Sequence, residues 1–204
     1  MSTRLKICGI TNLNDATACV DLGVDFLGFN FYSGSLRYIS PVDARSTIKE
    51  LPSTTKSVGI LVRPSRRDVK ETIIHSGIDM VQLYEPLDFS DFSQIPVPVI
   101  IVKRIADRVL HNYTLNGAAM ILLDTYSPEE LGGSGKVFDW SLIPASIPRD
   151  HLVLAGGITP ENIKDALDRV NPAVIDVASG AESEPGKKDL VKVKRLLDAV
   201  RGNF

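Results

Sequence analysis

Short apolar runs alternate with amphipathic stretches along the whole chain, and this alternation constrains the fold more than any other feature of the sequence. Several of the runs are apolar on both alternating faces, as expected for strands covered by helices. The eight candidate strands are residues 5–8, 25–29, 58–62, 79–83, 97–102, 119–123, 152–155 and 174–178. Strand–helix alternation of this kind favours a parallel sheet.

The stretches between the candidate strands have the features of helices. Ser40-Pro41, Ser65 and Thr159-Pro160 each look like an N-cap that precedes apolar residues at helical spacing. The signal after the fifth strand is the weakest, and residues 107–115 are the best candidate there. Eight strand–helix units in 204 residues predict an α/β fold. A closed (β/α)8 TIM barrel is favoured over an open doubly wound sheet. We expect one domain over residues 1–204.

Composition narrows the classes of partner. The net charge is −2, and lysines and arginines form no basic stripe, so a nucleic-acid partner is not expected. No run approaches the roughly 18 apolar residues of a membrane span. The two cysteines, Cys8 and Cys19, fit neither a CxxC pair nor a zinc site, which favours a reducing, cytoplasmic location. We therefore expect a small-molecule partner, in a protein that is a monomer or a homodimer.

Polar residues that end apolar runs are the first candidates for chemistry, because TIM-barrel active sites lie at the carboxyl ends of the strands. They are Cys8, Gln82, Asp124 and Asp176. Side chains alternate along a strand, so Lys6 points inward if Cys8 does. The last strand neighbours the first in a closed barrel, and Asp176 is therefore placed to pair with Lys6.

Cys8 and Asp124 each have a functional and a structural interpretation. An inward lysine beneath Cys8 favours a thiolate that acts as base or nucleophile, although an ion pair with Asp176 would weaken that effect. The alternative is a buried structural thiol, which is the interpretation we adopt for Cys19. Asp124 is either a turn residue or a site carboxylate. The glycine-rich residues 131–136 that follow it look like a mobile lid and favour the second.

Two glycine-containing loops predict a phosphate site. Gly156-Gly157 follows the seventh strand and Ser179-Gly180 follows the eighth, where TIM barrels commonly bind phosphate through backbone N–H groups. Arg37, after the second strand, carries a planar guanidinium that suits a carboxylate ligand. Residues 132–136 do not form a Walker A motif, because Lys136 is followed by Val137.

The motifs taken together resemble those of the phosphoribosylanthranilate isomerase family, in the family's order and over nearly the whole chain. They are KICGIT (6–11), LRYIS (36–40), LLD (122–124), GGSGK (132–136), FDW (138–140), AGG (155–157), DVASG (176–180) and PG (185–186). The resemblance implies a cofactor-free Amadori rearrangement of N-(5-phosphoribosyl)anthranilate to 1-(2-carboxyphenylamino)-1-deoxyribulose 5-phosphate, a step of tryptophan biosynthesis.

The resemblance also implies residue roles. Asp124 would be the general acid that opens the ribose ring, and Cys8 would be the general base that removes the C2 proton. Arg37 would hold the anthranilate carboxylate, and the two glycine-containing loops would surround the phosphate. The expected substrate-binding residues are Lys6, Arg37, Gln82, Gly133, Gly156, Gly157, Asp176, Ser179 and Gly180.

The chain departs from the family pattern at several positions. Tyr84 and Glu85 end the fourth strand, where the family usually has histidine and glycine. The other departures are Asn30, Arg63, Arg104 and Ala178. We expect these changes to alter substrate affinity and rate more than the type of reaction.

Other functions stay open at this point. A related sugar-phosphate isomerase that performs the same rearrangement would have aspartate in place of Cys8. A metal-dependent epimerase is disfavoured because His75, His111 and His151 lie away from the strand ends. From another class, a non-catalytic phosphosugar-binding barrel is the alternative, and the presence of both Cys8 and Asp124 argues against it.

Overall fold

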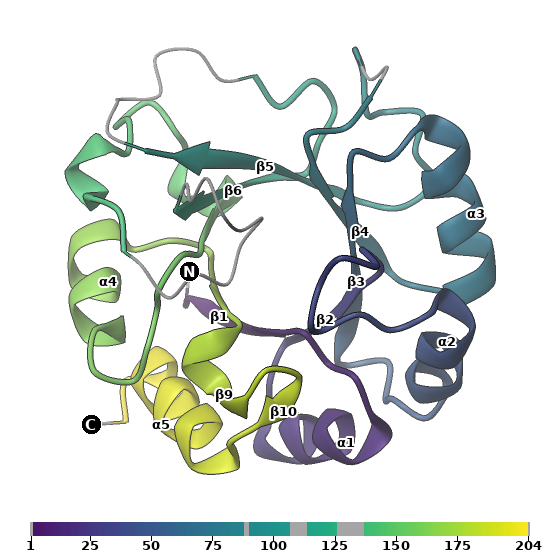
Figure 1. The fold of residues 1–204 in the computed structure, drawn as a ribbon. Helices are drawn as coiled ribbons and strands as arrows, with labels where there is room; N and C mark the ends of the chain where they lie inside the picture. Colours follow the sequence, from purple (N-terminus) through teal and green to yellow (C-terminus); the bar gives the residue numbers. More distant parts are fainter. Residues whose placement is uncertain (1, 88–89, 107–113, 126–136, 204) are drawn as a thin grey trace.

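Eight parallel strands close into a barrel in a computed structural model that describes residues 2–87, 90–106, 114–125 and 137–203 (Figure 1). They are β1 (Arg4–Cys8), β2 (Phe26–Asn30), β3 (Lys56–Val62), β4 (Met80–Tyr84), β5 (Val99–Ile105), β6 (Met120–Thr125), β7 (Leu152–Leu154) and β8 (Val174–Val177). They pair in sequence order, and β1 also pairs with β8, which closes the barrel. The predicted fold is confirmed.

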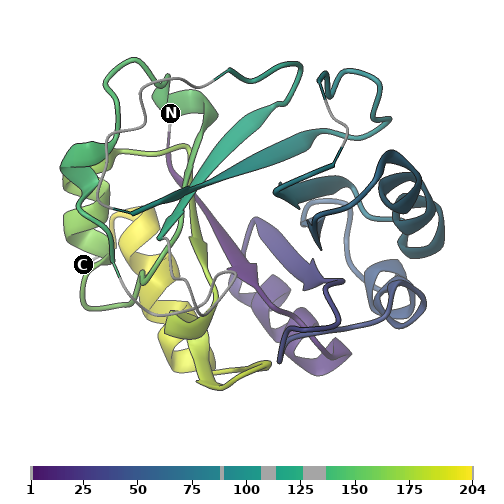
Figure 2. The ribbon, with the colours of Figure 1, turned by 45° about the horizontal axis from the view of Figure 1, so that its top comes forward.

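Helices surround the strands, as the views in Figures 1 and 2 show. They are α1 (Leu13–Leu22), α2 (Pro41–Lys49), α3 (Arg66–Ser76), α4 (Ile163–Val170) and α5 (Leu190–Arg201), with the 3-10 turns η1 (Trp140–Leu142) and η2 (Arg149–His151) before β7. Between β8 and α5 lie η3 (Ser179–Ala181) and a hairpin of β9 (Glu182–Glu184) and β10 (Lys187–Lys188). Most of the helix expected at residues 107–115 lies outside the described residues. None of the described helices is long and apolar enough to cross a membrane.

Two of the three predicted helix starts are confirmed and one is wrong. Ser40 caps α2, and Ser65 caps α3 in a capping box. Thr159 does not cap α4, which begins at Ile163 after Asn162. The Asn162 side chain accepts from the N–H of Thr159 at 2.9 Å and donates to the carbonyl of Gly157 at 2.8 Å. These bonds hold the intervening residues in a turn, so the helix starts later.

The strands bury side chains on both faces, as their apolar composition predicts. Leu5 and Ile7 belong to the large cluster between strands and helices, with Cys19 of α1, which is fully buried as expected. A second cluster that includes Val58 and Leu122 fills the barrel. On α5, the buried side chains are Val193, Leu196, Leu197 and Val200, which lie on one face of the helix.

Candidate active site

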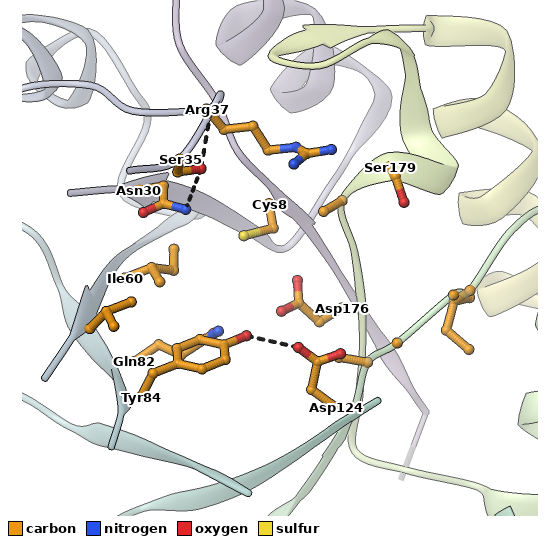
Figure 3. Close-up of a pocket in the computed structure, with 16 residues that line it drawn as sticks. Cys8, Asn30, Ser35, Arg37, Ile60, Gln82, Tyr84, Asp124, Asp176 and Ser179 are labelled. Atoms are coloured by element: carbon orange, nitrogen blue, oxygen red, sulfur yellow. Dashed lines mark hydrogen bonds between the residues drawn. The ribbon is translucent and has the colours of Figure 1, made fainter. Parts of the chain in front are cut away.

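A pocket opens at the carboxyl ends of the barrel strands, where the sequence places the chemistry (Figure 3). Of the predicted site residues, those that line it are Cys8, Arg37, Gln82, Asp124, Gly156, Gly157, Asp176 and Ser179. Lys6 is buried two residues before Cys8 on β1, and Gly180 directly follows Ser179. Gly133 and the expected lid, residues 131–136, lie outside the described residues.

The predicted ion pair between the first and last strands is confirmed. Lys6 and Asp176 occupy matching positions on β1 and β8, and Lys6 Nζ lies 2.8 Å from Asp176 Oδ2. Their side chains are 1% and 6% exposed, so each charge depends on the other for compensation. Burial lowers the pKa of Lys6, but Asp176 and Cys8 outweigh it and the net direction is upward. Lys6 therefore stays protonated beneath the pocket.

The thiol of Cys8 is less acidic than the sequence predicts. Burial is the largest influence and raises its pKa, while Lys6 and Lys188 lower it and Asp176 raises it further. The net direction is upward from the ordinary value. The physical reason is that desolvation disfavours the thiolate. In addition, Lys6 is paired with Asp176, whose negative charge offsets the stabilisation that Lys6 gives the thiolate. The thiol is therefore the main form of Cys8 near neutral pH.

Asp124 is placed to keep a proton at nearly neutral pH. Asp124 lies at the end of β6 and is 4% exposed. Burial raises the pKa of its carboxyl to about 6, although a hydrogen bond from Tyr84 lowers it. The Tyr84 hydroxyl donates to Asp124 Oδ2 at 3.1 Å, and the N–H of Thr125 donates to Oδ1 at 2.8 Å. Figure 3 shows the tyrosine bond across the pocket. This carboxyl can therefore act as an acid near pH 6.

Two residues that line the pocket each have a buried acceptor atom without a partner among the described residues. Within the described part of the chain, Gln82 Oε1 and Asp176 Oδ1 have no hydrogen-bond partner. Both residues line the pocket and are 1% and 6% exposed. An unpaired buried acceptor costs free energy, so these atoms are suited to receive hydroxyl donors from a ligand.

The loops after β7 and β8 need glycine for steric reasons. Gly156 has φ +85°, and a Cβ there would overlap the backbone and hydroxyl of Thr125 beside Asp124. A Cβ on Gly180 would overlap the carbonyl of Ile158. Backbone from both loops therefore comes close to the pocket, which is the arrangement a backbone phosphate site requires.

Arg37 lies at the pocket mouth and is held by Glu182, a residue that the sequence does not single out. Its Nε donates to Glu182 Oε1 at 2.9 Å, and its Nη2 donates to Glu182 Oε2 at 2.8 Å. Glu182 on β9 is separated from Arg37 by 145 residues, and no local spacing indicates the contact. The sequence marks Tyr84 only as a departure from the family pattern, because its bond to Asp124 depends on β4 and β6 lying on either side of β5 in the barrel.

Three departures from the family pattern form one cluster at the ends of β3, β4 and β5. Arg63 Nε donates to Glu85 Oε2 at 2.9 Å, and Arg104 Nη2 donates to Glu85 Oε1 at 2.7 Å. Arg104 also pairs in register with Asp124, whose pKa it lowers. Glu85 therefore links the two arginines and compensates part of their positive charge beside the pocket.

Known proteins of one family match nearly the whole chain in sequence. A profile of the family described as N-(5'phosphoribosyl)anthranilate (PRA) isomerase matches residues 5–199. A Nitrosomonas europaea N-(5'-phosphoribosyl)anthranilate isomerase is 41% identical over 98% of this chain and 96% of its own length. The Thermotoga maritima protein of the same name is 41% identical over 98% of each chain.

Solved structures of the same kind of protein resemble the fold. Phosphoribosyl anthranilate isomerase of Thermus thermophilus has a TM-score of 0.86 at 30% identity, with 98% of this chain and 99% of the other covered. Another, solved with reduced 1-(o-carboxyphenylamino)-1-deoxyribulose 5-phosphate, has a TM-score of 0.77 at 33% identity and the same coverage. A structure of monomers generated from the dimeric Thermotoga maritima enzyme has a TM-score of 0.80 at 34% identity and again the same coverage.

Proposed function

The chain belongs to the N-(5'-phosphoribosyl)anthranilate isomerase family, and it is an isomerase of tryptophan biosynthesis. On this premise we propose that it converts N-(5'-phosphoribosyl)anthranilate to 1-(2-carboxyphenylamino)-1-deoxyribulose 5-phosphate by general acid and general base catalysis. Asp124 is the acid and Cys8 is the base. The observation that carries the proposal is the presence of both groups in one pocket, with the pKa of Asp124 raised to about 6.

Asp124 acts first. It gives its proton to the ring oxygen of the ribose as the C1–O bond breaks, and the nitrogen lone pair forms the C1=N bond of a Schiff base. A carboxyl with a pKa near 6 is a stronger donor than water and still partly protonated near neutrality, which suits this step. The Tyr84 hydroxyl holds Asp124 Oδ2 in place.

Cys8 acts second. Its thiolate takes the proton from C2, and the bonding electrons form a C1=C2 double bond while the positive charge on nitrogen is lost. The resulting enolamine gains a proton at C1 and loses one from the C2 hydroxyl, which gives the ketone. The charge of Lys6 favours the thiolate, although burial works against it, so the reactive pair is a minor protonation state.

The rest of the pocket binds the substrate. Backbone N–H groups around Gly156, Gly157, Ser179 and Gly180 hold the phosphate, and Arg37 holds the anthranilate carboxylate. The unpaired acceptors of Gln82 and Asp176 receive ribose hydroxyl groups. The solved relative with a reduced carboxyphenylamino ribulose phosphate supports a ligand that carries all of these groups.

The proposal extends to organisation and location. We take residues 1–204 as one domain and the protein as cytoplasmic, where its two thiols remain reduced. The dimeric Thermotoga maritima relative supports a homodimer. Sedimentation of the purified protein distinguishes a homodimer from a monomer.

Turnover of freshly generated N-(5'-phosphoribosyl)anthranilate tests the function. The proposal predicts a loss of anthranilate-type fluorescence that is faster than spontaneous decay in a protein-free control. A protein that binds the reduced product analogue but never turns the substrate over would contradict it. In that case the chain would be a phosphosugar-binding barrel that has lost catalysis.

A further inference from the structure

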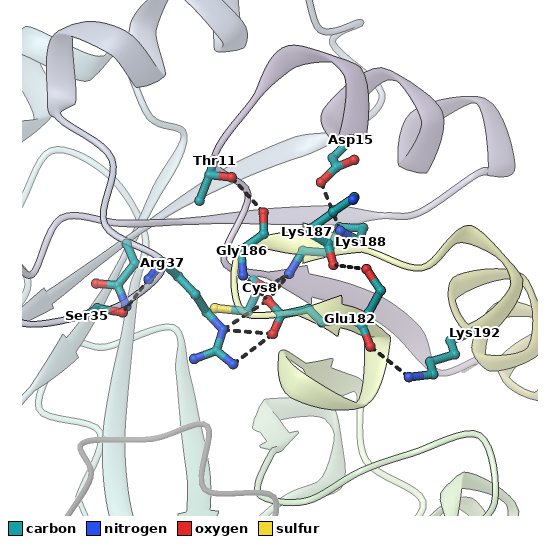
Figure 4. Close-up of polar contacts among 12 residues, drawn as sticks. Cys8, Thr11, Asp15, Ser35, Arg37, Glu182, Gly186, Lys187, Lys188 and Lys192 are labelled. Carbon is teal, nitrogen blue, oxygen red and sulfur yellow. Dashed lines mark hydrogen bonds and ion pairs between the residues drawn. The ribbon is translucent and has the colours of Figure 1, made fainter.

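Two oppositely charged side chains that the mechanism does not use are buried beside the pocket. Glu182 on β9 and Lys188 on β10 belong to the hairpin between β8 and α5, and their side chains are 3% and 0% exposed (Figure 4). Lys188 Nζ lies 2.6 Å from Glu182 Oε1. Burying a charge is costly unless it is fully paired, so the position of this pair calls for a reason.

Glu182 is the centre of the cluster. Both of its oxygens accept from the guanidinium of Arg37, and Oε1 also accepts from the N–H of Gly186 at 3.2 Å and from Lys188. Its pKa is raised by burial but lowered more strongly by Arg37 and Lys188, so it is ionised near neutrality. A bidentate pair of this kind fixes both the position and the plane of a guanidinium.

Lys188 ties this cluster to the first strand. Its side-chain ammonium donates to the backbone carbonyl of Cys8 at 2.6 Å, and its backbone N–H donates to the carboxylate of Asp15 on α1 at 2.9 Å. Thr11 donates to the carbonyl of Gly186 at 2.7 Å from the β1–α1 loop. The hairpin is therefore docked on the barrel by contacts at several points, and Glu182 is held rigidly.

Arg37 is constrained on its other side as well. A Cβ on Gly9 would overlap the Arg37 side chain. Because glycine has no Cβ, the arginine side chain can cross the end of β1. Glu182 engages the edge formed by Nε and Nη2. The edge formed by Nη1 and Nη2 is directed away from Glu182 by the planar geometry of the group. Arg37 lines the pocket, so its guanidinium borders the space that a bound substrate would occupy.

We propose that Glu182 is a positioning residue for this reaction, which sets the Arg37 guanidinium to receive the substrate carboxylate, while Lys188 also pairs with Glu182 and links it to the backbone carbonyl of Cys8. This inference rests on the proposed function. Substrate binding then avoids the cost of ordering a flexible arginine, because the protein has ordered it already.

The test compares ligands with and without a carboxylate. Glu182→Gln keeps the shape of the side chain but removes its charge and turns one acceptor into a donor that faces a cation. We expect the Kd of the reduced product analogue, measured by calorimetry, and the KM of the substrate to rise by on the order of 10- to 100-fold, the range for losing a hydrogen bond to a charged group. The Kd of inorganic phosphate should stay at the wild-type value.

Glu184→Gln is the matched control on the same strand. Its side chain is 66% exposed and pairs with Lys187 at 3.4 Å, so wild-type constants are expected. Equal loss of phosphate and analogue binding in Glu182→Gln would show general damage and overturn the inference, as would no change in either. Wild-type protein that binds the analogue without turnover would refute the proposed function instead, and the affinity comparison would still test Glu182.

Glu182→Asp serves if the glutamine variant does not fold. It retains the charge but shortens the side chain, so the guanidinium must move or lose one of its two bonds. The same selective weakening of analogue binding is expected, to a smaller degree than with glutamine. A folded Glu182→Asp protein with wild-type KM and analogue Kd would overturn the inference.

Discussion

Asp124 and Cys8 share one pocket but need opposite protonation states for the proposed reaction. Burial raises the pKa of both groups, which helps the carboxyl and hinders the thiol. The state with a protonated Asp124 and an ionised Cys8 is therefore a minor one at any pH. A pH profile of kcat/KM therefore gives two apparent pKa values that belong to the pair of groups and not to either residue alone.

The hydrogen bond from Tyr84 predicts a shift in that profile. Removing the hydroxyl in Tyr84→Phe removes the bond that lowers the pKa of Asp124, so this pKa should rise above about 6. Arg104 on β5 also lowers it, and Asp176 on β8 raises it; both remain in the variant. We expect the acidic limb of kcat/KM to move to higher pH in steady-state assays. An unchanged limb would mean that Tyr84 does not act on the carboxyl.

Asp124 should also destabilise the folded protein at alkaline pH. Its folded pKa of about 6 lies above the ordinary value of 3.8, so its ionisation opposes folding as pH rises through 6. Asp124→Asn is therefore expected to stabilise the protein at pH ~8 by on the order of 2–3 kcal/mol, at about 1.4 kcal/mol per pKa unit. Urea unfolding measures the gain, which should vanish near pH ~4. Equal gains at both pH values would contradict the pKa assignment.

Single-residue roles were predictable from the sequence only in part. Cys8 and Asp124 end apolar runs, and the topology of a barrel brings such ends together. The half-buried position of Cys8 and the raised pKa of its thiol depend on neighbours from other strands, which no local spacing encodes. The same holds for Tyr84 and Glu182, whose partners lie 40 and 145 residues away.

Among the secondary-structure elements, the strands were easier to predict than the helix boundaries. All eight apolar runs became barrel strands, because a run that is apolar on both faces has few other stable environments. The predicted start of α4 at Thr159 was wrong because the Asn162 side chain accepts from the N–H of Thr159 and holds the residues between them in a turn. The hairpin of β9 and β10 was not predicted, since its strands are short and mostly polar.

The loop after β8 predicts a selective effect on phosphate. In Gly180→Ala the new Cβ would overlap the carbonyl of Ile158, so the loops that follow β7 and β8 must move apart. We expect weaker binding of inorganic phosphate in calorimetry and a higher KM. Gly77→Ala is the control, because a Cβ on Gly77 at the end of α3 would meet nothing within 4 Å and costs only the strain of its φ of +73°. Both variants losing phosphate affinity equally would contradict a local role for Gly180.

Across the molecule as a whole, one ion pair lies over the seam that closes the barrel. Lys6 and Asp176 join β1 to β8 with a sequence separation of 170 residues. Lys6→Met should destabilise the fold by about 3–5 kcal/mol, because it leaves the charge of Asp176 buried and uncompensated. Adding Asp176→Leu should restore much of that loss. Denaturant unfolding of wild type, both single variants and the double variant checks this, and strictly additive losses would contradict the coupling.

The acid and base roles are tested most directly by kcat for N-(5'-phosphoribosyl)anthranilate in wild type, Cys8→Ala and Asp124→Asn. We predict that wild type turns the substrate over and that each substitution lowers kcat by at least about 10²-fold, the range for a positioned acid or base. Each variant should still bind the reduced product analogue. Wild-type kcat in either folded variant would contradict the assignment of that residue.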